Sequence, residues 1–448
     1  MGIVVMKFGG TSVGDPERMR EVARLARLNA AGGVLVVVSA MSGVTDALFR
    51  AAKAACAGDL QAALAMCAEL RARHLAAVRA LRPEGDTAVE TEIASILQAL
   101  ESRLHGVRLL AELSERSMDD IASAGERLSG LLVALAADAP CIDARSVMRT
   151  DSRFGEARPD RKAIAKLVAD RILPLLGPGK IAVTQGYIGA DSGGATTTLG
   201  RGGSDYSASL FGAALGAGEI QIWTDVEGIL TCDPRVVPKA RTVETLGYEE
   251  AAELAAYGAK VLHPATIRPA LEAGIPVTVR STLKSDGLFS TISPGSSSGR
   301  AAVAIAMRRN VAILSVRQES MTEQSGFLAR LFKVFGLHGV SVDLVSTSEI
   351  CVSVSLDMGE PLEALAADLS ELGKVDLEVD RVVVAVVGDM LKETPAVLRK
   401  AFIALGDIDV DMVSMGANDI NLSLVMKAEG AEQALRRLHA AFFEGDAA

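Results

Sequence analysis

The sequence predicts an α/β fold, a mainly parallel sheet sandwiched by helices, followed by two small α+β modules. Strand-type runs alternate with helical stretches over roughly the first 295 residues, which is typical of a parallel sheet covered on both faces. A serine- and glycine-rich linker at residues 293–300 ends this alternation. Beyond it, similar segments recur 68 residues apart. These three observations define the expected architecture.

Composition limits the classes of function. At 448 residues the chain is long enough for two or three domains, and 49% hydrophobic content is ample for buried cores. The formal charge of -10 and the aromatic content of 4% argue against a nucleic-acid or anionic-membrane surface. No apolar run approaches the roughly 20 residues of a membrane span, and no basic-then-apolar leader precedes Lys7. With five scattered cysteines and no Cys-x-x-Cys pair, we expect a cytoplasmic protein with reduced thiols.

The chain begins as strand, loop, helix, strand. Residues 3–6 form a short apolar run, and a helix follows with Asp15 as N-cap and Pro16 as its first residue. The β-branched run at 34–38 is typical of a strand buried on both faces. From about 46 to 138 the alanine- and leucine-rich sequence predicts several long helices.

The alternation then resumes. Strands are predicted at 180–185, 220–224 and 275–279, and helices at 160–176, 206–216, 248–257 and 263–273. In such a sheet we expect the ligand at the carboxyl ends of the strands.

The second half contains an internal repeat. The segment at 340–346 resembles that at 408–414, and 352–356 resembles 420–424. With helices expected at about 326–337 and 394–405, each copy reads strand, helix, strand, strand, helix. Two βαββαβ modules in tandem are the simplest interpretation, and they serve either as a dimerising lobe or as a ligand sensor.

The loop at 196–205 is the most distinctive stretch of the first half. Gly202 and Gly203 permit close backbone approach, Ser204 and Asp205 are expected to cap a helix beginning near Tyr206, and Arg201 adds a positive charge. The pattern fits an anion site, although a tight turn with a good N-cap fits it equally well.

Other stretches after strand-type runs carry groups suited to phosphate or carboxylate. No Walker A pattern, protein-kinase catalytic loop, dinucleotide fingerprint or His-Glu-x-x-His zinc site is present, and no metal-ligand cluster can be identified. The phosphate cradle must therefore be of another design. The stretches concerned are 7–12, 39–45, 124–126, 186–205, 224–235 and 257–264.

Four motifs resemble those of the aspartokinases, amino-acid-kinase-fold enzymes with two C-terminal ACT domains. They are Lys7-Phe-Gly-Gly-Thr-Ser12, Thr196-Thr-Thr-Leu-Gly-Arg-Gly-Gly-Ser-Asp205, Trp223-Thr-Asp-Val-Glu-Gly-Ile229 and Gly258-Ala-Lys-Val-Leu-His-Pro264. The resemblance covers nearly the whole chain. It implies an amino-acid-kinase catalytic domain at 1–295 and ferredoxin-like ACT domains at 301–380, which binds the effector, and at 381–448.

The resemblance implies transfer of the ATP γ-phosphoryl group to the side-chain carboxylate of L-aspartate, the first step towards lysine, threonine and methionine. The acceptor has a reference pKa of about 3.9 and is already ionised at pH 7, so no general base is needed. Charge neutralisation and alignment are needed instead, because two anions must meet. Magnesium is expected with ATP, held mainly by phosphates and water.

The resemblance also assigns roles in the active site. Lys7 and the amides of Gly9 and Gly10 are assigned to the transferring phosphate, and Asp205 is expected to hold the cations in register as well as to cap its helix. Arg201 is assigned to the α-carboxylate of aspartate and Glu126 to its ammonium, although Glu126 taken alone reads as an ordinary helix-surface carboxylate. The remaining substrate-binding residues are Ser39, Thr45 and Ser204.

A second set resembles nucleotide contacts. Thr224 and Asp225 alone would fit an Asx-type turn. At Leu230 several family members carry tyrosine, so an aliphatic wall replaces any stacking contact with adenine. Lys260 is expected to reach the phosphates. The full set is Lys7, Gly10, Thr224, Asp225, Leu230, Asp233, Arg235 and Lys260.

Two segments of the first repeat resemble the effector-binding segment of lysine-sensitive, monofunctional aspartokinases. They are Ser325-Gly-Phe-Leu328 and Val342-Asp-Leu-Val-Ser-Thr-Ser-Glu349. Asp343, Ser348 and Glu349 are assigned to the ammonium groups of L-lysine, whereas Phe327 and Leu328 fit equally well as core residues. The second repeat lacks the Thr-Ser-Glu triplet, so effector binding is expected in the first only. The facing wall comprises Met321, Ser325, Gly326, Phe327, Leu328 and Val342.

Two other functions stay open at this point. One is a kinase of the same fold acting on another small acid, such as glutamate or a nucleoside monophosphate; the other is a non-catalytic amino-acid sensor on a kinase scaffold. Threonine, or lysine with threonine, is an alternative effector. Because ACT-type modules expose sheet edges, we expect a homodimer or a dimer of dimers through them.

Overall fold

The computed structural model describes residues 2–258, 264–293, 295, 298–318, 325–359, 361–391, 396–415 and 419–444. The chain divides into two compact units, Met1–Ile229 with Val261–Ser296, and Leu230–Lys260 with Ser297–Ala448.

The first unit is built on a parallel sheet. Its strands follow the order β3-β4-β2-β1-β7-β9-β10, parallel up to β9, and β10 pairs antiparallel to β9. The central strand β2 is fully buried, as its β-branched run predicts. The strands are β1 (Val4–Phe8), β2 (Val34–Val38), β3 (Cys141–Ile142), β4 (Ile181–Gln185), β7 (Glu219–Thr224), β9 (Val277–Ser281) and β10 (Ser290–Ser293), with a separate hairpin of β5 (Ile188–Ala190) and β6 (Thr196–Thr198).

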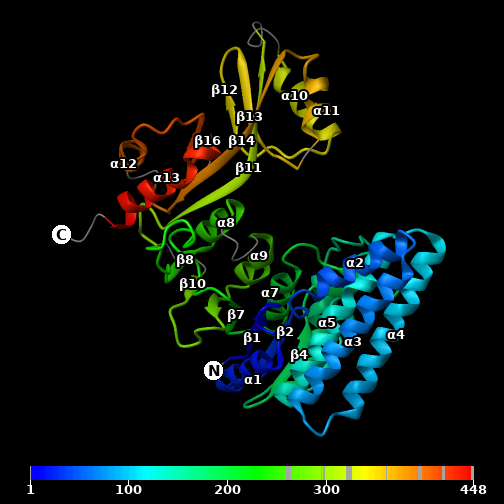
Figure 1. The fold of residues 1–448 in the computed structure, drawn as a ribbon. Coiled ribbons are helices and arrows are strands. Elements are labelled where there is room, and N and C mark those ends of the chain that lie inside the picture. The colour runs from blue at the N-terminus through cyan, green and yellow to red at the C-terminus, as the bar shows by residue number, and fades with distance from the viewer. Residues whose placement is uncertain are drawn as a thin grey trace. The chain divides into compact units, whose positions relative to one another are not determined.

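Helices cover this sheet. The alanine- and leucine-rich region forms four long helices, α2 to α5, that lie side by side (Figure 1). Helix α1 begins as predicted, with Pro16 in its first turn and the Asp15 carboxylate accepting the Arg18 N–H at 2.9 Å. The helices are α1 (Pro16–Asn29), α2 (Val44–Cys56), α3 (Leu60–Leu81), α4 (Thr87–Leu110), α5 (Glu115–Ala137), α6 (Arg161–Arg171), α7 (Gly203–Leu215) and α9 (Pro264–Glu272).

The second unit contains a sheet with the strand order β12-β13-β11-β14-β16-β15. Helices α10 and α11 lie beside one half of it, and α12 and α13 beside the other (Figure 1). Its elements are β8 (Thr245–Gly247), α8 (Tyr248–Ala256), β11 (Ala304–Arg317), α10 (Phe327–Leu337), β12 (Val345–Thr347), β13 (Cys351–Asp357), α11 (Leu362–Leu369), β14 (Lys374–Val387), α12 (Ala396–Leu405), β15 (Met412–Met415), β16 (Asn421–Lys427) and α13 (Ala428–His439). The predicted repeat of strand, helix, strand, strand, helix is confirmed.

The two modules are joined by shared strands. Strands β11 and β14 pair antiparallel along their length, and each carries a left-handed residue near its middle, Asn310 (φ 61) and Asp380 (φ 57). The second half of β11 supplies Leu314 to the core of the first module, while Ile305 packs in the core of the second. The first half of β11 therefore contributes to the second module, and its second half contributes to the first module. The boundary expected between residues 380 and 381 falls inside β14.

The fold class predicted from sequence is confirmed, with a helix-covered parallel sheet followed by two α+β modules. Within the described parts of the chain, no helix combines the length and apolar character that crossing a bilayer requires.

Candidate active site

A cavity of about 740 Å³ opens at the carboxyl ends of β1 and β2, where the fold class predicts a ligand. The N-termini of α2 and α7 contribute to its wall, so two positive helix-dipole ends lie there. Eight of the predicted site residues line it: Lys7, Gly10, Ser39, Thr45, Glu126, Arg201, Ser204 and Asp205.

Lys7 and Asp205 form an ion pair in this cavity. The Lys7 ammonium lies 2.7 Å from Asp205 Oδ1, and both side chains are largely buried. Lys7 is fixed by its position in β1, between β2 and β7. A carboxylate in the first turn of α7 also suits the helix dipole. The pair therefore holds a cation at a defined place on the cavity wall.

The expected capping role of Ser204 and Asp205 is wrong. Helix α7 begins at Gly203, with Gly202 as N-cap at φ 71, and no side chain caps it. Because the left-handed glycine starts the helix three residues earlier than expected, Asp205 lies inside the first turn and its carboxylate reaches Lys7 instead.

The neighbouring glycines serve packing within the protein. A Cβ at Gly203 would lie 2.7 Å from the ring of Tyr187, so this glycine makes room for a protein side chain. A Cβ at Gly10 would lie 2.8 Å from the Ala40 carbonyl oxygen, and the Ser42 N–H donates to the Gly10 carbonyl at 3.1 Å. Gly10 thus lets the loops that follow β1 and β2 approach each other.

Gly9 differs from Gly10. Its N–H donates to the Trp223 carbonyl at 3.3 Å, which continues the pairing of β1 with β7, and it does not line the cavity. The Gly9 amide is therefore engaged by the sheet, whereas Gly10 faces the cavity.

Glu126 is buried in α5, contrary to the surface position that it would have as an ordinary helix carboxylate. Its side chain is only 4% exposed; Oε1 accepts the Ala40 N–H at 3.2 Å, and Oε2 has no hydrogen-bond partner among the described residues. Burial raises the pKa of this carboxyl to about 8. Gly125 allows the close approach, because a Cβ there would lie 2.8 Å from that of Ala40. An unsatisfied, buried carboxyl oxygen on a cavity wall suits a cationic ligand group.

Arg201 provides the opposite charge. It is exposed on the loop between β6 and α7, and in the described part of the chain no residue pairs with its guanidinium. Nearby, the Ser39 hydroxyl donates to the Ser204 hydroxyl at 3.0 Å, and Thr45 lies in the first turn of α2. The cavity thus presents a carboxyl, a guanidinium and hydroxyls to a small ligand.

Asp119 and Asp120, which the sequence reasoning did not single out, hold the strand before this loop. The buried Asp119 accepts the Thr198 N–H at 2.9 Å, the Thr198 hydroxyl at 2.7 Å and the Gly155 N–H at 2.9 Å. Asp119 precedes Glu126 by seven residues, about two turns on one helix face. This seven-residue spacing from Glu126 could have identified Asp119 as a candidate site residue from the sequence.

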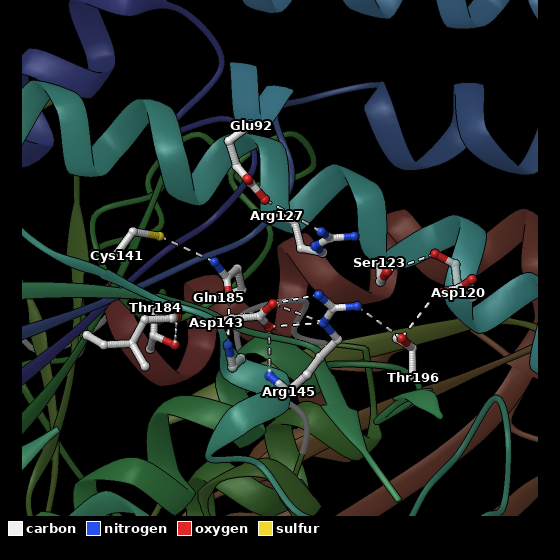
Figure 2. A network of polar contacts seen from close by, with 12 residues as sticks. Glu92, Asp120, Ser123, Arg127, Cys141, Asp143, Arg145, Thr184, Gln185 and Thr196 are labelled. Carbon is white, nitrogen blue, oxygen red and sulfur yellow. Dashed lines mark hydrogen bonds and ion pairs between the residues drawn. The ribbon is translucent and has the colours of Figure 1, made fainter. Parts of the chain in front are cut away.

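Figure 2 shows the other end of this attachment. The Thr196 hydroxyl donates to Asp120 at 3.2 Å, and the Arg145 guanidinium lies between Asp143, at 2.6 Å, and Thr196, at 3.4 Å. Helix α5 therefore holds β6 at both ends of the strand, through Asp120 at Thr196 and Asp119 at Thr198. The loop carrying Arg201 starts from a fixed strand.

Tyr187 is a third residue that the sequence did not single out. It lines the cavity and adopts a left-handed backbone with φ 68, which is unusual for a tyrosine. Its N–H donates to the Ser207 hydroxyl at 3.0 Å, which fixes the turn between β4 and β5 against α7.

The predicted nucleotide contacts are distributed over both units. Thr224 ends β7 and its hydroxyl donates to Asp225 at 3.1 Å, and neither residue lines the cavity. Leu230, Asp233 and Arg235 belong to the second unit.

Asp233 and Arg235 form a two-point ion pair with distances of 3.0 and 2.7 Å, which lowers the pKa of Asp233. Lys260 lies outside the described residues.

The predicted effector residues occupy three places in the first module. Gly326 is the left-handed N-cap of α10, after Ser325; Phe327 is buried in the module core, and Leu328 is 43% exposed. Val342 packs against the same core. Met321 lies outside the described residues.

The predicted acidic contacts flank β12. The Asp343 carboxylate pairs with Arg308, which also lies 3.0 Å from Asp357. Ser348 turns the chain towards β13 through its N–H, which donates to the Cys351 carbonyl at 2.8 Å, and Glu349 is exposed next to it.

Comparison with known proteins agrees with this architecture. Residues 2–281 match the amino acid kinase family, and residues 384–442 match an ACT domain. The chain is 38% identical to lysine-sensitive aspartokinase 3 of Escherichia coli over 99% of both proteins, and 36% identical to chloroplastic aspartokinase 3 of Arabidopsis thaliana, covering 99% of this chain and 82% of that protein.

Solved structures give the same result. The crystal structure of E. coli aspartokinase III in complex with aspartate and ADP matches at a TM-score of 0.85 and 37% identity, covering 98% of this chain and all of that one. The same enzyme in complex with lysine and aspartate matches at 0.82 and 37% identity, covering 98% of this chain and 99% of that one. The chain belongs to the amino acid kinase family and, within it, to the aspartokinases.

Proposed function

We propose that this chain transfers the γ-phosphoryl group of ATP to the side-chain carboxylate of L-aspartate in the cavity at the ends of β1 and β2. The observation that carries the proposal is a pair of groups on its wall that lack partners among the described residues, the buried Glu126 Oε2 and the Arg201 guanidinium. An α-amino acid carries the complementary ammonium and α-carboxylate. The E. coli relative crystallised with aspartate and ADP supports this choice of ligands.

Phosphoryl transfer to a carboxylate needs no proton acceptor, because the acceptor is ionised at neutral pH. The task of the protein is to bring two anions together in line. Lys7, held by Asp205 at 2.7 Å, and the two helix N-termini supply the positive potential that this requires. Gly10 lines the same cavity, and its backbone is the proposed contact for the phosphates.

Magnesium fits the same region. A hard divalent cation prefers oxygen ligands, and the carboxylates of Asp205 and Asp46 line the cavity, so Mg²⁺ would enter with the phosphates of ATP and be shared with them. When bound, it neutralises charge on the transferring group.

The reaction can be tested by trapping the acyl phosphate with hydroxylamine. With ATP and Mg²⁺ present, we expect aspartyl hydroxamate to form when aspartate is added, and little hydroxamate with glutamate. A nucleoside monophosphate would form no acyl phosphate, so coupled ADP release measures that acceptor, and we expect little release with it. Equal rates with another acid would indicate a different substrate. No hydroxamate and no ADP release with any acceptor would favour a non-catalytic sensor.

L-lysine is the proposed inhibitor, acting at Asp343, Ser348 and Glu349. The carboxylates of Asp343 and Glu349 suit two ammonium groups, and the E. coli relative is named as lysine-sensitive. Inhibition assays with lysine, threonine and both together separate this proposal from the alternatives.

A homodimer or a dimer of dimers is proposed for the assembly. Strands β12 and β15 are the edges of the second sheet, and β12 is exposed along its length, which suits pairing with another copy. Light scattering with and without lysine measures the assembly.

The five cysteines are free, which fits a reducing cytoplasm as the proposed location.

A further inference from the structure

The segment with the proposed nucleotide residues Leu230, Asp233 and Arg235 packs on the C-terminal module. Cys232, Val236 and Val237 belong to the same hydrophobic cluster as residues of α13 and β16. We call residues 230–241 the nucleotide loop. Its attachment to α13 is not part of the proposed chemistry.

A chain of hydrogen bonds joins this loop to the end of α13. The Arg241 N–H donates to Thr231 Oγ1 at 3.1 Å, and Thr231 Oγ1 lies 3.0 Å from His439 Nε2. On its other side, His439 Nδ1 lies 3.0 Å from the Glu444 carboxylate, which Lys239 also contacts at 2.5 Å. Thr231 and His439 are 3% and 1% exposed, so water cannot replace these contacts.

The partners determine how protons are arranged along the chain. Glu444 can only accept from His439, so Nδ1 of a neutral imidazole carries the hydrogen and Nε2 is the acceptor. With this neutral ring the Thr231 hydroxyl donates to Nε2. In this arrangement the Thr231 hydroxyl and both ring nitrogens of His439 have hydrogen-bond partners. The nucleotide loop is held at Thr231, Lys239 and Arg241.

A second contact lies one turn earlier on the same helix. Arg436 Nε donates to the Val236 carbonyl at 3.1 Å. Asp233 and Arg235, with their two-point ion pair, thus lie between two points, Thr231 and Val236, that α13 holds. The conformation of this short stretch is set by the C-terminal helix.

We propose that His439 is a positioning residue for the nucleoside triphosphate, acting through Thr231 to hold the nucleotide loop in its binding conformation. The inference rests on the proposed ATP-dependent function and on the nucleotide role that the resemblance to aspartokinases implies for Asp233 and Arg235. It makes the end of the second ACT module a determinant of ATP affinity and leaves aspartate binding to the first unit.

The test is a steady-state comparison of KM values for ATP and aspartate in the full-length protein. For His439→Ala we expect the KM for ATP to rise roughly tenfold, the effect of losing one hydrogen bond of about 1.4 kcal/mol, with the KM for aspartate within about twofold of wild type. Thr231→Val should behave alike, and Thr231→Ser, which keeps the hydroxyl, should restore the wild-type value. This second pair decides the question if His439→Ala fails to fold.

Arg437→Ala is the matched control. Arg437 is on the same helix, but it donates to the Leu405 carbonyl at 2.6 Å and to Asp407 at 2.7 Å, away from the loop. It should lower the melting temperature without raising the KM for ATP. An unchanged KM for ATP in both His439→Ala and Thr231→Val, or an equal rise for both substrates, would overturn the proposal. If the wild-type protein forms no aspartyl hydroxamate, the proposed function fails instead.

Discussion

Glu126 couples substrate binding to pH at the scale of a single residue. Its pKa of about 8 means that the empty site holds a neutral carboxyl at pH 7, because burial opposes the charge. An ammonium group favours the ionised form, so aspartate binding should release a proton and tighten as pH rises towards 8. Calorimetry in two buffers of different ionisation enthalpy measures this release. A binding constant that does not vary between pH 6 and 8 would contradict it.

The same group affects stability, and Glu126→Gln is the matched variant. Since the folded pKa lies above the unfolded value of about 4.3, the contribution to the free energy of unfolding is fully present below that value and is lost as pH rises to about 8. The amide cannot ionise, so the variant should lose less stability than wild type over this range in denaturant titrations. Its KM for aspartate should rise, and the rise should correspond to a loss of about 2–5 kcal/mol of binding free energy.

Helix α5 sets the geometry of the aspartate site at the scale of elements. It carries Glu126 and, two turns earlier, Asp119, which accepts two hydrogen bonds from Thr198 at the end of β6, before the loop to Arg201, and a third from the Gly155 N–H. Asp119→Ala should cost about 2–4 kcal/mol of unfolding free energy, because buried donors lose a charged partner. It should also raise the KM for aspartate more than that for ATP. The exposed Glu115→Ala, in the first turn of α5, is the control and should change neither.

The turn after β1 gives a sharper pair of variants. A Cβ at Gly10 would lie 2.8 Å from the Ala40 carbonyl, whereas one at Gly9 meets nothing closer than 3.8 Å. Gly10→Ala should therefore displace the loop after β2 and reduce kcat/KM by roughly 100-fold, about 2.7 kcal/mol, and Gly9→Ala by less than tenfold. Equal effects in the two variants would show that the close approach at Gly10 is not what matters.

Elements with strong local signals could be predicted from sequence. The β-branched run of β2 and the Asp15-Pro16 start of α1 determine their structures locally. The start of α7 was missed because glycine at 202 and 203 permits several conformations, and packing of Gly203 against Tyr187 selects one. The burial of Glu126 could not be predicted either, since it depends on contact with a loop 86 residues away.

For the whole molecule, the repeat in the sequence reveals two modules but not how they share strands. Pairing of β11 with β14 joins residues about 70 positions apart, and sequence periodicity carries no information on such partners. The same holds for the nucleotide loop, whose Cys232, Val236 and Val237 pack against α13 some 200 residues later.

Inhibition by lysine is the proposed regulation of the whole molecule, with Glu349 in the first ACT module as a proposed contact. Glu349→Ala should abolish inhibition by lysine while leaving kcat unchanged, because it removes a carboxylate proposed to bind an ammonium group. Glu363→Ala, an exposed carboxylate on α11 of the same module, is the control and should stay sensitive. Inhibition curves at fixed ATP and aspartate measure the effect. Wild-type inhibition of the Glu349 variant would contradict the assignment.

We expect the cavity at the ends of β1 and β2 to carry out phosphoryl transfer to aspartate, with Lys7 as the cation at the transferring group. The most direct test is the rate of aspartyl hydroxamate formation by wild type and Lys7→Met at saturating ATP, Mg²⁺ and aspartate. The loss of one charged group aimed at the transition state should lower kcat by roughly 100- to 1,000-fold while the fold is retained by circular dichroism. A Lys7→Met protein that forms hydroxamate at the wild-type rate would show that Lys7 does not stabilise the transferring group.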